Sequence, residues 1–432
     1  MEVAIIGAGI TGIHAALELA AQGHAVVVFE RSGSVASESS FAQGGLSAPA
    51  LSGVWGALCG SQPLALQGSS LSHPAWRWAA RQARNRRDDT TAATLRALAQ
   101  QSLARSTVLR RQLQLDHERS EGLLLLVRSE AQARLAQALA ESWQQASVSH
   151  AWRDAEQCRQ QEPGLNPDTP LHGGWHLPEA EATNGRELCL LLKQAAQRLG
   201  VHFSFHTEVR QLQAGKRPAL THGPAPQAGL PAVSPRQDAA SAAGPATLPS
   251  PREVQTHSFD AVVVCGAQPE DPLLHQLGLK PALRQVWGRT LTAPLRQLEA
   301  FPDLGPRANL IDDAQQVILS RLGQRVRVSG GASFQPPSRG DKGFEALHAV
   351  LHDWFPGAIQ PQQLQYWQGS RLMSADGLPL LGASGAEGIW LNLAHGGQGA
   401  AMAAGAAQVV SALIGGRDPG LDLTPFAATR RG

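Results

Sequence analysis

The chain has 432 residues, a formal net charge of +2 and a charged fraction of 17%. This length can bury a large core and predicts two domains, and the nearly balanced charge gives no indication of nucleic-acid binding. The four cysteines lie far apart without a C-x-x-C pair, so we expect buried thiols in a reducing cytosol and neither disulfides nor a metal site.

The first residues predict a strand, a glycine turn and a helix. An apolar run over residues 3–6 predicts a buried strand, and a helical pattern begins at Ile13. Between them, Gly7, Gly9 and Gly12 form G-x-G-x-x-G. In a dinucleotide-binding turn, the first glycine permits the tight bend, the second lets the backbone approach a pyrophosphate and the third lets the helix pack closely. The helix N-terminus adds free N–H groups for the phosphates. The predicted dinucleotide site therefore comprises Ile6, Gly7, Ala8, Gly9, Ile10, Thr11 and Gly12.

A second apolar run, Ala25 to Phe29, ends in an acidic residue, Glu30. A carboxylate at this place would accept hydrogen bonds from a ribose hydroxyl pair and repel a 2′-phosphate, so we add Glu30 and Arg31 to the site. The alternative is a glycine-rich turn in an unrelated α/β protein. Because the first predicted strand begins at Val3 and no apolar stretch reaches the ~20 residues that span a bilayer, we expect no signal peptide and a cytoplasmic location.

The middle of the chain alternates between helical and strand patterns and contains one unusual segment. Pro218 to Pro251 holds eight prolines and no aromatic residue, a composition that predicts a disordered insertion because it buries too little apolar surface. The other predicted elements are a helical stretch at 75–146 interrupted by a strand at 123–127, a helix at 185–199, strands at 202–209 and 260–267, β-like alternation over 284–334 and a helix near 343–353.

A basic cluster with neighbouring tryptophans lies early in this stretch. It suggests a peripheral membrane contact at the inner face of the membrane, although we favour a solvent-exposed helix face with packed tryptophans. The cluster consists of Arg77, Arg81, Arg84, Arg86 and Arg87, with Trp76 and Trp78.

The C-terminal part predicts a second strand, glycine turn and helix. An apolar run over 388–393 precedes His395-Gly-Gly-Gln-Gly399, and small residues with a helical pattern follow from Ala400 to Ile414. An NAD enzyme needs no such unit, but FAD is long enough to use both turns. The second helix could direct its positive end toward the isoalloxazine, where negative charge develops on reduction.

Four separated motifs now indicate a family. Residues 38–45 (Glu-Ser-Ser-Phe-Ala-Gln-Gly-Gly) resemble a flavin loop written E-T-S-F-A-N-A-G, and 173–178 resemble G-G-L-x-L-P. Residues 367–377 resemble W-T-G-L-R-P-M-T-P-D-G, and 394–414 resemble the ending G-H-G…M-A-x-G…Q-x-x-S-x-L-I. The chain resembles the FAD-dependent amine oxidoreductases of the D-amino-acid oxidase superfamily, and among them most closely the bacterial D-amino-acid dehydrogenases.

The resemblance implies an α/β fold in which a Rossmann-type FAD-binding domain is interleaved with a mixed-sheet α+β substrate domain. The implied FAD-binding parts are 1–75, 151–275 (with a disordered insertion at 214–255) and 365–432. The implied substrate-domain parts are 76–150, which is helical, and 276–364, which forms the β-sheet.

The implied activity is oxidative deamination of D-amino acids to 2-oxo acids and ammonia, by hydride transfer from the α-carbon to flavin N5. Electrons would pass on to a quinone or another electron-transfer acceptor. The FAD would be non-covalent, since no cysteine lies in the C-terminal turn. The implied flavin contacts beyond the first turn are Ser39, Ser40, Gln43, Gly44, Gly45, Val209, Gly266, Gly396, Gly397, Gln398 and Gly399.

Two residues carry the implied substrate chemistry. Arg371 occupies the position of the family's carboxylate-binding arginine, and a guanidinium suits that role because it donates two parallel hydrogen bonds. The alternative is an arginine that braces the sheet, and Leu372 departs from the proline that usually follows. His395 either positions the flavin or caps the helix start. Because Tyr366 is the only tyrosine, other side chains would contact the substrate, and Trp287 is one candidate.

Other activities remain open at this point. They are a glycine, sarcosine or imino-acid oxidase, one flavin subunit of a multi-component dehydrogenase, a 2-hydroxy-acid dehydrogenase of the same superfamily, and a non-catalytic flavin-binding protein.

Overall fold

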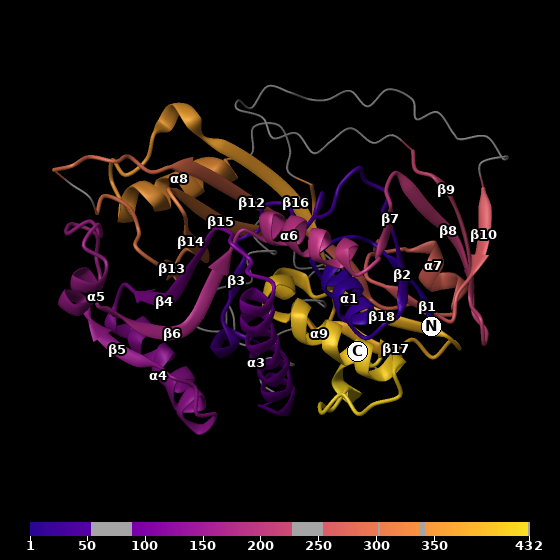
Figure 1. Cartoon of the computed structure of the whole chain (residues 1–432). Helices are drawn as coiled ribbons and strands as arrows, with labels where there is room; N and C mark the ends of the chain where they lie inside the picture. The colour runs from indigo at the N-terminus through magenta and orange to yellow at the C-terminus, as the bar shows by residue number, and fades with distance from the viewer. Residues whose placement is uncertain (53–88, 227–253, 301–302, 337–341, 431–432) are drawn as a thin grey trace.

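The computed structural model describes residues 1–52, 89–226, 254–300, 303–336 and 342–430. Two large sheets organise these residues, one of six strands and one of nine (Figure 1). The chain passes between the two sheets several times. The interleaved α/β arrangement that the sequence predicts is therefore confirmed.

The six-stranded sheet has the order β17-β18-β11-β1-β2-β7. Neighbouring strands from β18 to β7 are parallel, and only β17 runs antiparallel to its neighbour. This is a Rossmann-type sheet built from both ends of the chain. Its strands are β1 (Glu2–Ile6), β2 (Ala25–Phe29), β7 (His202–Ser204), β11 (Ala261–Val264), β17 (Leu380–Ala383) and β18 (Ile389–Leu393).

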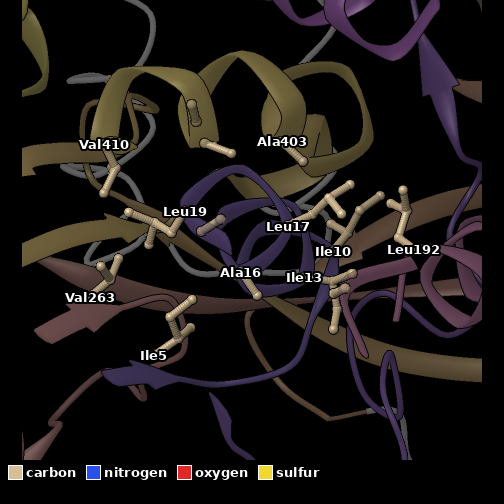
Figure 2. Packing of buried hydrophobic residues seen from close by; sticks show 14 of the residues in the cluster. Ile5, Ile10, Ile13, Ala16, Leu17, Leu19, Leu192, Val263, Ala403 and Val410 are labelled. Atoms are coloured by element: carbon tan, nitrogen blue, oxygen red, sulfur yellow. The ribbon is translucent and has the colours of Figure 1, made fainter. Parts of the chain in front are cut away.

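Helices cover one face of this sheet. Ile5 and Val263 point from the strands toward α1, and Ala403 and Val410 of α9 approach α1 from the opposite side (Figure 2). Leu192 of α6 completes the layer at one end of α1, while α3 packs on the outside of α9. The helices are α1 (Ile10–Ala21), α3 (Asp89–Gln112), α6 (Gly185–Arg198) and α9 (Gly399–Ile414).

A three-stranded antiparallel sheet and the short helix α7 (Pro272–Gln276) cover the other face. The small sheet consists of β8 (Thr207–Gln213), β9 (Ala219–Pro224) and β10 (Gln255–Ser258). The predicted disorder of 214–255 is therefore wrong at its first end, because β9 pairs with β8 and buries Leu220 against the core. Residues 227–253 lie outside the described part.

The nine-stranded sheet has the order β16-β12-β15-β14-β13-β4-β6-β3, and β5 also pairs with β6. Most of its neighbours are antiparallel, but β4 and β13 are parallel, so the sheet is mixed as predicted. Its strands are β3 (Leu46–Ser47), β4 (Arg119–Val127), β5 (Ala151–Asp154), β6 (Gly173–Thr183), β12 (Leu283–Pro294), β13 (Asn309–Asp312), β14 (Val317–Leu322), β15 (Arg325–Ser333) and β16 (Gln365–Ser374).

The two faces of this sheet have different environments. Helix α8 (Gly343–Trp354) packs on one face over β12, β14 and β15, and α5 (Ala155–Gln161) lies beside β5 and β6. Helix α4 (Glu130–Gln145) and the loop after β3 pack on the opposite face.

Strand membership differs from the predicted domain boundaries at three places. Strand β3, within the segment 1–75 that was assigned to the FAD-binding part, pairs with β6 in the nine-stranded sheet. Strands β5 and β6, within the segment 151–275, belong to the nine-stranded sheet, although that segment was assigned to the FAD-binding part. Strand β16, at the start of the segment 365–432, belongs to the nine-stranded sheet as well. Pairing with β6, β4 and β12 decides the three cases, and sequence periodicity carries no information on which sheet a strand joins.

Helix α9 consists mainly of small and apolar residues. Together with the turn before it (Gly396–Ile414), it is the one stretch among the described residues that is long and apolar enough to cross a membrane. It packs between α1 and α3, and more than half of its most apolar window is buried inside the protein. Its apolar composition is therefore that of a core helix.

Candidate functional site

The glycine turn after β1 has the geometry that each glycine predicts. Gly7 has a φ of +100°, a conformation that side chains disfavour, and a Cβ there would lie 3.1 Å from the Gly266 nitrogen. A Cβ on Gly12 would lie 1.9 Å from the Gly7 carbonyl oxygen, so only glycine lets α1 approach β1 this closely. Gly9 lines an open cavity.

Polar side chains hold this turn from two directions. The Glu30 carboxylate accepts hydrogen bonds from the backbone N–H groups of Ala8 and Ser32, both at 2.7 Å. The Ser40 hydroxyl accepts from the Ile10 N–H at 3.1 Å. Each carboxylate oxygen keeps a second lone pair, so Glu30 can still accept hydrogen bonds from a ribose.

A cavity of about 620 Å³ lies above this turn, within the usual range for ligand sites. It runs between the carboxyl ends of the parallel strands and the C-terminal turn, where a doubly wound fold binds its cofactor. The predicted site residues that line it are Ile6, Gly7, Gly9, Ile10, Thr11, Glu30, Arg31, Ser39, Ser40, Gln43, Gly45, Val209, Gly266, Arg371, His395, Gly396 and Gly399.

Five predicted site residues do not line the cavity. Ala8 points away from it and is buried, and Gly12 lies beneath the turn. Gly44 faces the nine-stranded sheet, where a Cβ would contact Ser329. Gly397 and Gln398 belong to the C-terminal turn without lining the cavity.

The cavity also has lining residues that sequence reasoning missed. Gly185 begins α6 directly beside the flavin loop, a strand-to-helix junction that could have drawn notice. Thr207 precedes Val209 on β8, and Cys265 and Gln268 flank Gly266 after β11. No sequence motif singles these three out, because their position follows from where the strands end.

Buried polar atoms without partners gather at the C-terminal turn, η5 (Gly396–Gln398), and its neighbours. They are Arg371 Nε, Asn392 Nδ2, His395 Nδ1 and Gln398 Oε1. Buried polar groups in a folded protein are nearly always hydrogen-bonded. These donors and acceptors lie beside the N-terminus of α9 and could pair with the polar edge of a flavin. The residues are therefore suited to hold FAD.

His395 is buried at this turn and is held by its neighbours. Its Nε2 lies 2.7 Å from the Asn392 amide oxygen, and its backbone forms a bridge with Met373 of β16. Because an amide oxygen only accepts, Nε2 carries the proton and Nδ1 is left as an acceptor. Burial lowers the pKa of His395 to about 4, so the ring is neutral near pH 7.

Arg371 lies on β16 beside the cavity. Its guanidinium packs against two glycines. A Cβ on Gly288 would lie 2.9 Å from Nη1, and a Cβ on Gly397 would lie 3.6 Å from Nε. Among the described residues, no carboxylate forms an ion pair with it, and burial lowers its pKa. The Ser39 hydroxyl donates to the Ser370 carbonyl at 2.7 Å, which ties the flavin loop to this strand.

The remaining sequence candidates have other positions. Tyr366 packs edge-on against Phe344 on the α8 side of the sheet, so the single tyrosine does not reach Arg371's face. Trp287 pairs with Ser370 in the backbone register but does not line the cavity. The basic cluster at 77–87 lies outside the described residues.

The cysteines were expected to be buried thiols. Cys158, Cys189 and Cys265 are free. Burial raises the pKa of Cys158 and of Cys189 to about 12, and it also raises the pKa of Cys265. These three thiols are therefore neutral. Cys158 and Cys189 are buried, as predicted, whereas Cys265 is half-buried and lines the cavity. Cys59 lies outside the described residues.

Comparison with known proteins agrees with the site. A family described as FAD dependent oxidoreductase matches residues 2–413. A D-amino acid dehydrogenase of Cereibacter sphaeroides is 31% identical over 452 residues, which are 100% of this chain and 95% of the relative. A D-amino acid dehydrogenase of Vibrio atlanticus is 29% identical over 96% of each chain.

The fold is also found among solved structures. Glycine oxidase from Geobacillus kaustophilus has a TM-score of 0.70 at 20% identity, covering 100% of this chain and 98% of its own. The resemblance inferred from the four motifs is thus confirmed. The chain therefore belongs to the FAD-dependent oxidoreductase family.

Proposed function

We propose that the protein oxidises D-amino acids to 2-oxo acids and ammonia and passes the electrons to a quinone or another electron-transfer acceptor. Two curated relatives of about 30% identity, aligned over nearly their whole length, are named D-amino acid dehydrogenase. Their naming as dehydrogenases supports an acceptor other than oxygen. Within the protein, the observation that carries the proposal is the unpaired guanidinium of Arg371 beside the cofactor cavity.

An α-carboxylate suits Arg371 for electrostatic and geometric reasons. A partly buried guanidinium without a carboxylate partner is costly, and an incoming carboxylate removes that cost. Two parallel N–H donors also fix the plane of the carboxylate. This contact would hold the α-carbon of the substrate at a defined distance from the flavin-facing turn.

The other site residues orient the reacting groups. FAD, when bound, supplies the hydride acceptor. His395 is neutral and offers Nδ1 as an acceptor, and Asn392 fixes its ring. Ser39 and Ser40 fix the flavin loop to β16 and to α1, so the cofactor loop and the carboxylate clamp hold a constant separation. Such positioning is the main contribution a protein makes to a flavin reaction.

We further propose that the protein works in the cytoplasm. For the basic cluster at 77–87, a peripheral contact with the inner face of a membrane is the alternative to the solvent-exposed face favoured above. A membrane quinone would then be within reach of the reduced enzyme. The five arginines of 77–87, with Trp78 among them and Trp76 next to them, support this alternative.

Replacement of Arg371 tests the carboxylate clamp. We expect Arg371→Ala to lower kcat/KM for D-amino acids by about 100-fold, ~3 kcal/mol, because the substrate carboxylate loses its partner. The flavin spectrum should be unchanged, since the glycine turn remains intact. Arg371→Lys should recover part of the loss through its charge. Steady-state kinetics with an artificial electron acceptor measures both.

Arg284→Ala is the matched control. Arg284 lies on β12, the strand paired with β16, but its side chain is exposed. Its kinetics should equal those of the wild type. If Arg371→Ala instead loses FAD and thermal stability together while residual activity keeps its KM, Arg371 braces the sheet and the clamp assignment is wrong.

A further inference from the structure

A second buried arginine, Arg327, lies close to the flavin loop. It is on β15 and is only 5% exposed. Its Nε donates to the Thr292 hydroxyl at 3.3 Å, and its Nη1 donates to the Gln43 carbonyl at 3.2 Å. Both partners are neutral. Within the described part of the chain, no carboxylate forms an ion pair with Arg327.

The flavin loop lies between this guanidinium and the cofactor cavity, since it contacts Arg327 and also lines the cavity. Gln43 and Gly45 line the cavity. Between them, Gly44 lies close to the nine-stranded sheet, where a Cβ would be 3.4 Å from Ser329. Ser329 is two residues after Arg327 on β15, so the two side chains are on the same face of the strand. One layer of backbone, the flavin loop, therefore separates Arg327 from the space that the cofactor would fill.

The charge at Arg327 is only partly balanced by its neighbours. Arg325, two residues earlier on the same face, forms an ion pair with Glu118. Arg325 repels Arg327 more strongly than the Glu118 carboxylate attracts it. Burial and Arg325 lower the pKa of Arg327 to about 10, so Arg327 remains charged at neutral pH. A buried, incompletely compensated cation is unfavourable unless an anion approaches it.

We propose that Arg327 is a positioning residue for the cofactor, whose positive charge stabilises reduced FAD relative to oxidised FAD. When the isoalloxazine takes up two electrons and one proton, one negative charge is added to it. A cation held behind the flavin loop in a water-poor environment is strongly attracted to that charge. The proposal rests on the FAD cofactor alone and is independent of which amino acid the enzyme oxidises.

Two variants distinguish the effect of Arg327's charge from the effect of its hydrogen bond to the flavin loop. Arg327→Gln keeps a donor for the Gln43 carbonyl but removes the charge, whereas Arg327→Lys keeps the charge. We expect the glutamine variant to bind reduced FAD about tenfold less tightly relative to oxidised FAD. That is a fall of about 30 mV in the two-electron midpoint potential. The lysine variant should retain most of the wild-type potential.

The measurement is an anaerobic redox titration of each holoenzyme with reference dyes and without amino acid. Arg325→Gln is the matched control: it removes the same charge from the same strand and face, but at an arginine that pairs with Glu118 and does not line the cavity. Its potential should fall less than that of Arg327→Gln. An unchanged potential in Arg327→Gln, with FAD bound, would overturn the proposal and leave Arg327 a support for the loop.

The lysine variant provides a second test if the glutamine variant fails to fold. A buried lysine loses its proton at lower pH than an arginine does. The midpoint potential of Arg327→Lys should therefore fall increasingly below the wild-type value as the pH rises from 7 to 10. A constant difference across this range would contradict an electrostatic role.

Discussion

At the scale of single residues, the absence of a side chain at Gly288 leaves space for the Arg371 guanidinium. Gly288 is buried on β12, opposite Gly369 in the β12–β16 register. A Cβ at Gly288 would lie 2.9 Å from Arg371 Nη1 and close to the carbonyl oxygens of Gly330 and Gly331. The guanidinium therefore packs against backbone atoms. Any residue larger than glycine at position 288 would occupy the space that the guanidinium takes up.

Gly288→Ala tests this arrangement. The added methyl group must displace the Arg371 guanidinium, so we expect the KM for the amino acid to rise about tenfold, ~1.4 kcal/mol. FAD binding should not change. Steady-state kinetics in the wild type and in an Arg371→Lys background form a double-mutant cycle. Equal effects in the two backgrounds would show that Gly288 acts independently of Arg371.

The glycines and charged residues of the first turn are predictable from sequence because one contiguous segment forms the whole turn. Gly7, Gly12 and Glu30 have the local positions that the motif requires. Gly288 and Arg327 have no such signature. Their roles depend on which strands pair and in which register, and a sequence of alternating residues does not specify either.

At the scale of elements, a buried ion pair joins α1 to α3. Arg105 donates to both carboxylate oxygens of Glu18, at 2.5 and 3.0 Å. His14, one turn before Glu18 on α1, is buried, and its Nδ1 has no hydrogen-bond partner in the part of the chain that the structure describes. Burial, and secondarily the nearby Arg105, lower the pKa of His14 from 6.5 to about 4.

This interface predicts sensitivity to acid. Because the folded state disfavours protonated His14, its contribution is fully present above the unfolded pKa of 6.5 and is lost as the pH falls toward 4. Between pH 7 and 5 we expect the free energy of unfolding to fall by about 2 kcal/mol from this residue. His14→Gln should lose this part of the pH dependence in urea titrations, whereas His202→Gln, at an exposed histidine, should keep it. The same pH dependence in both variants would assign the effect to other groups.

Most elements were predictable, and the failures have local causes. Strands β1, β2, β11 and β18 and the helices α6, α8 and α9 lie within a few residues of their predicted ranges, whereas β17 was not predicted. The predicted strand at 202–209 is instead two strands, because His206 adopts a φ of +53° between them. Strand β9 was missed because prolines and glycines surround a strand whose hydrogen bonds come from β8 and β10.

At the scale of the whole molecule, the cofactor cavity depends on segments from the entire chain. Its lining comes from the first turn, the flavin loop, the start of α6, strand β8, the end of β11 and the C-terminal turn. The sheet that bears Arg371 and Arg327 meets this cavity at the flavin loop. Folding of both sheets is therefore required before a cofactor site exists, and Arg371, the proposed carboxylate clamp, is fixed relative to it.

The central claim, that this oxidoreductase takes electrons from D-amino acids, is tested most directly by an anaerobic spectrum of the purified protein. The oxidised-flavin absorption is followed while D-amino acids, L-amino acids, glycine, sarcosine and 2-hydroxy acids are added in turn. We expect D-isomers alone to bleach it. Bleaching by L-isomers or by hydroxy acids, with no response to D-amino acids, would contradict the proposed function.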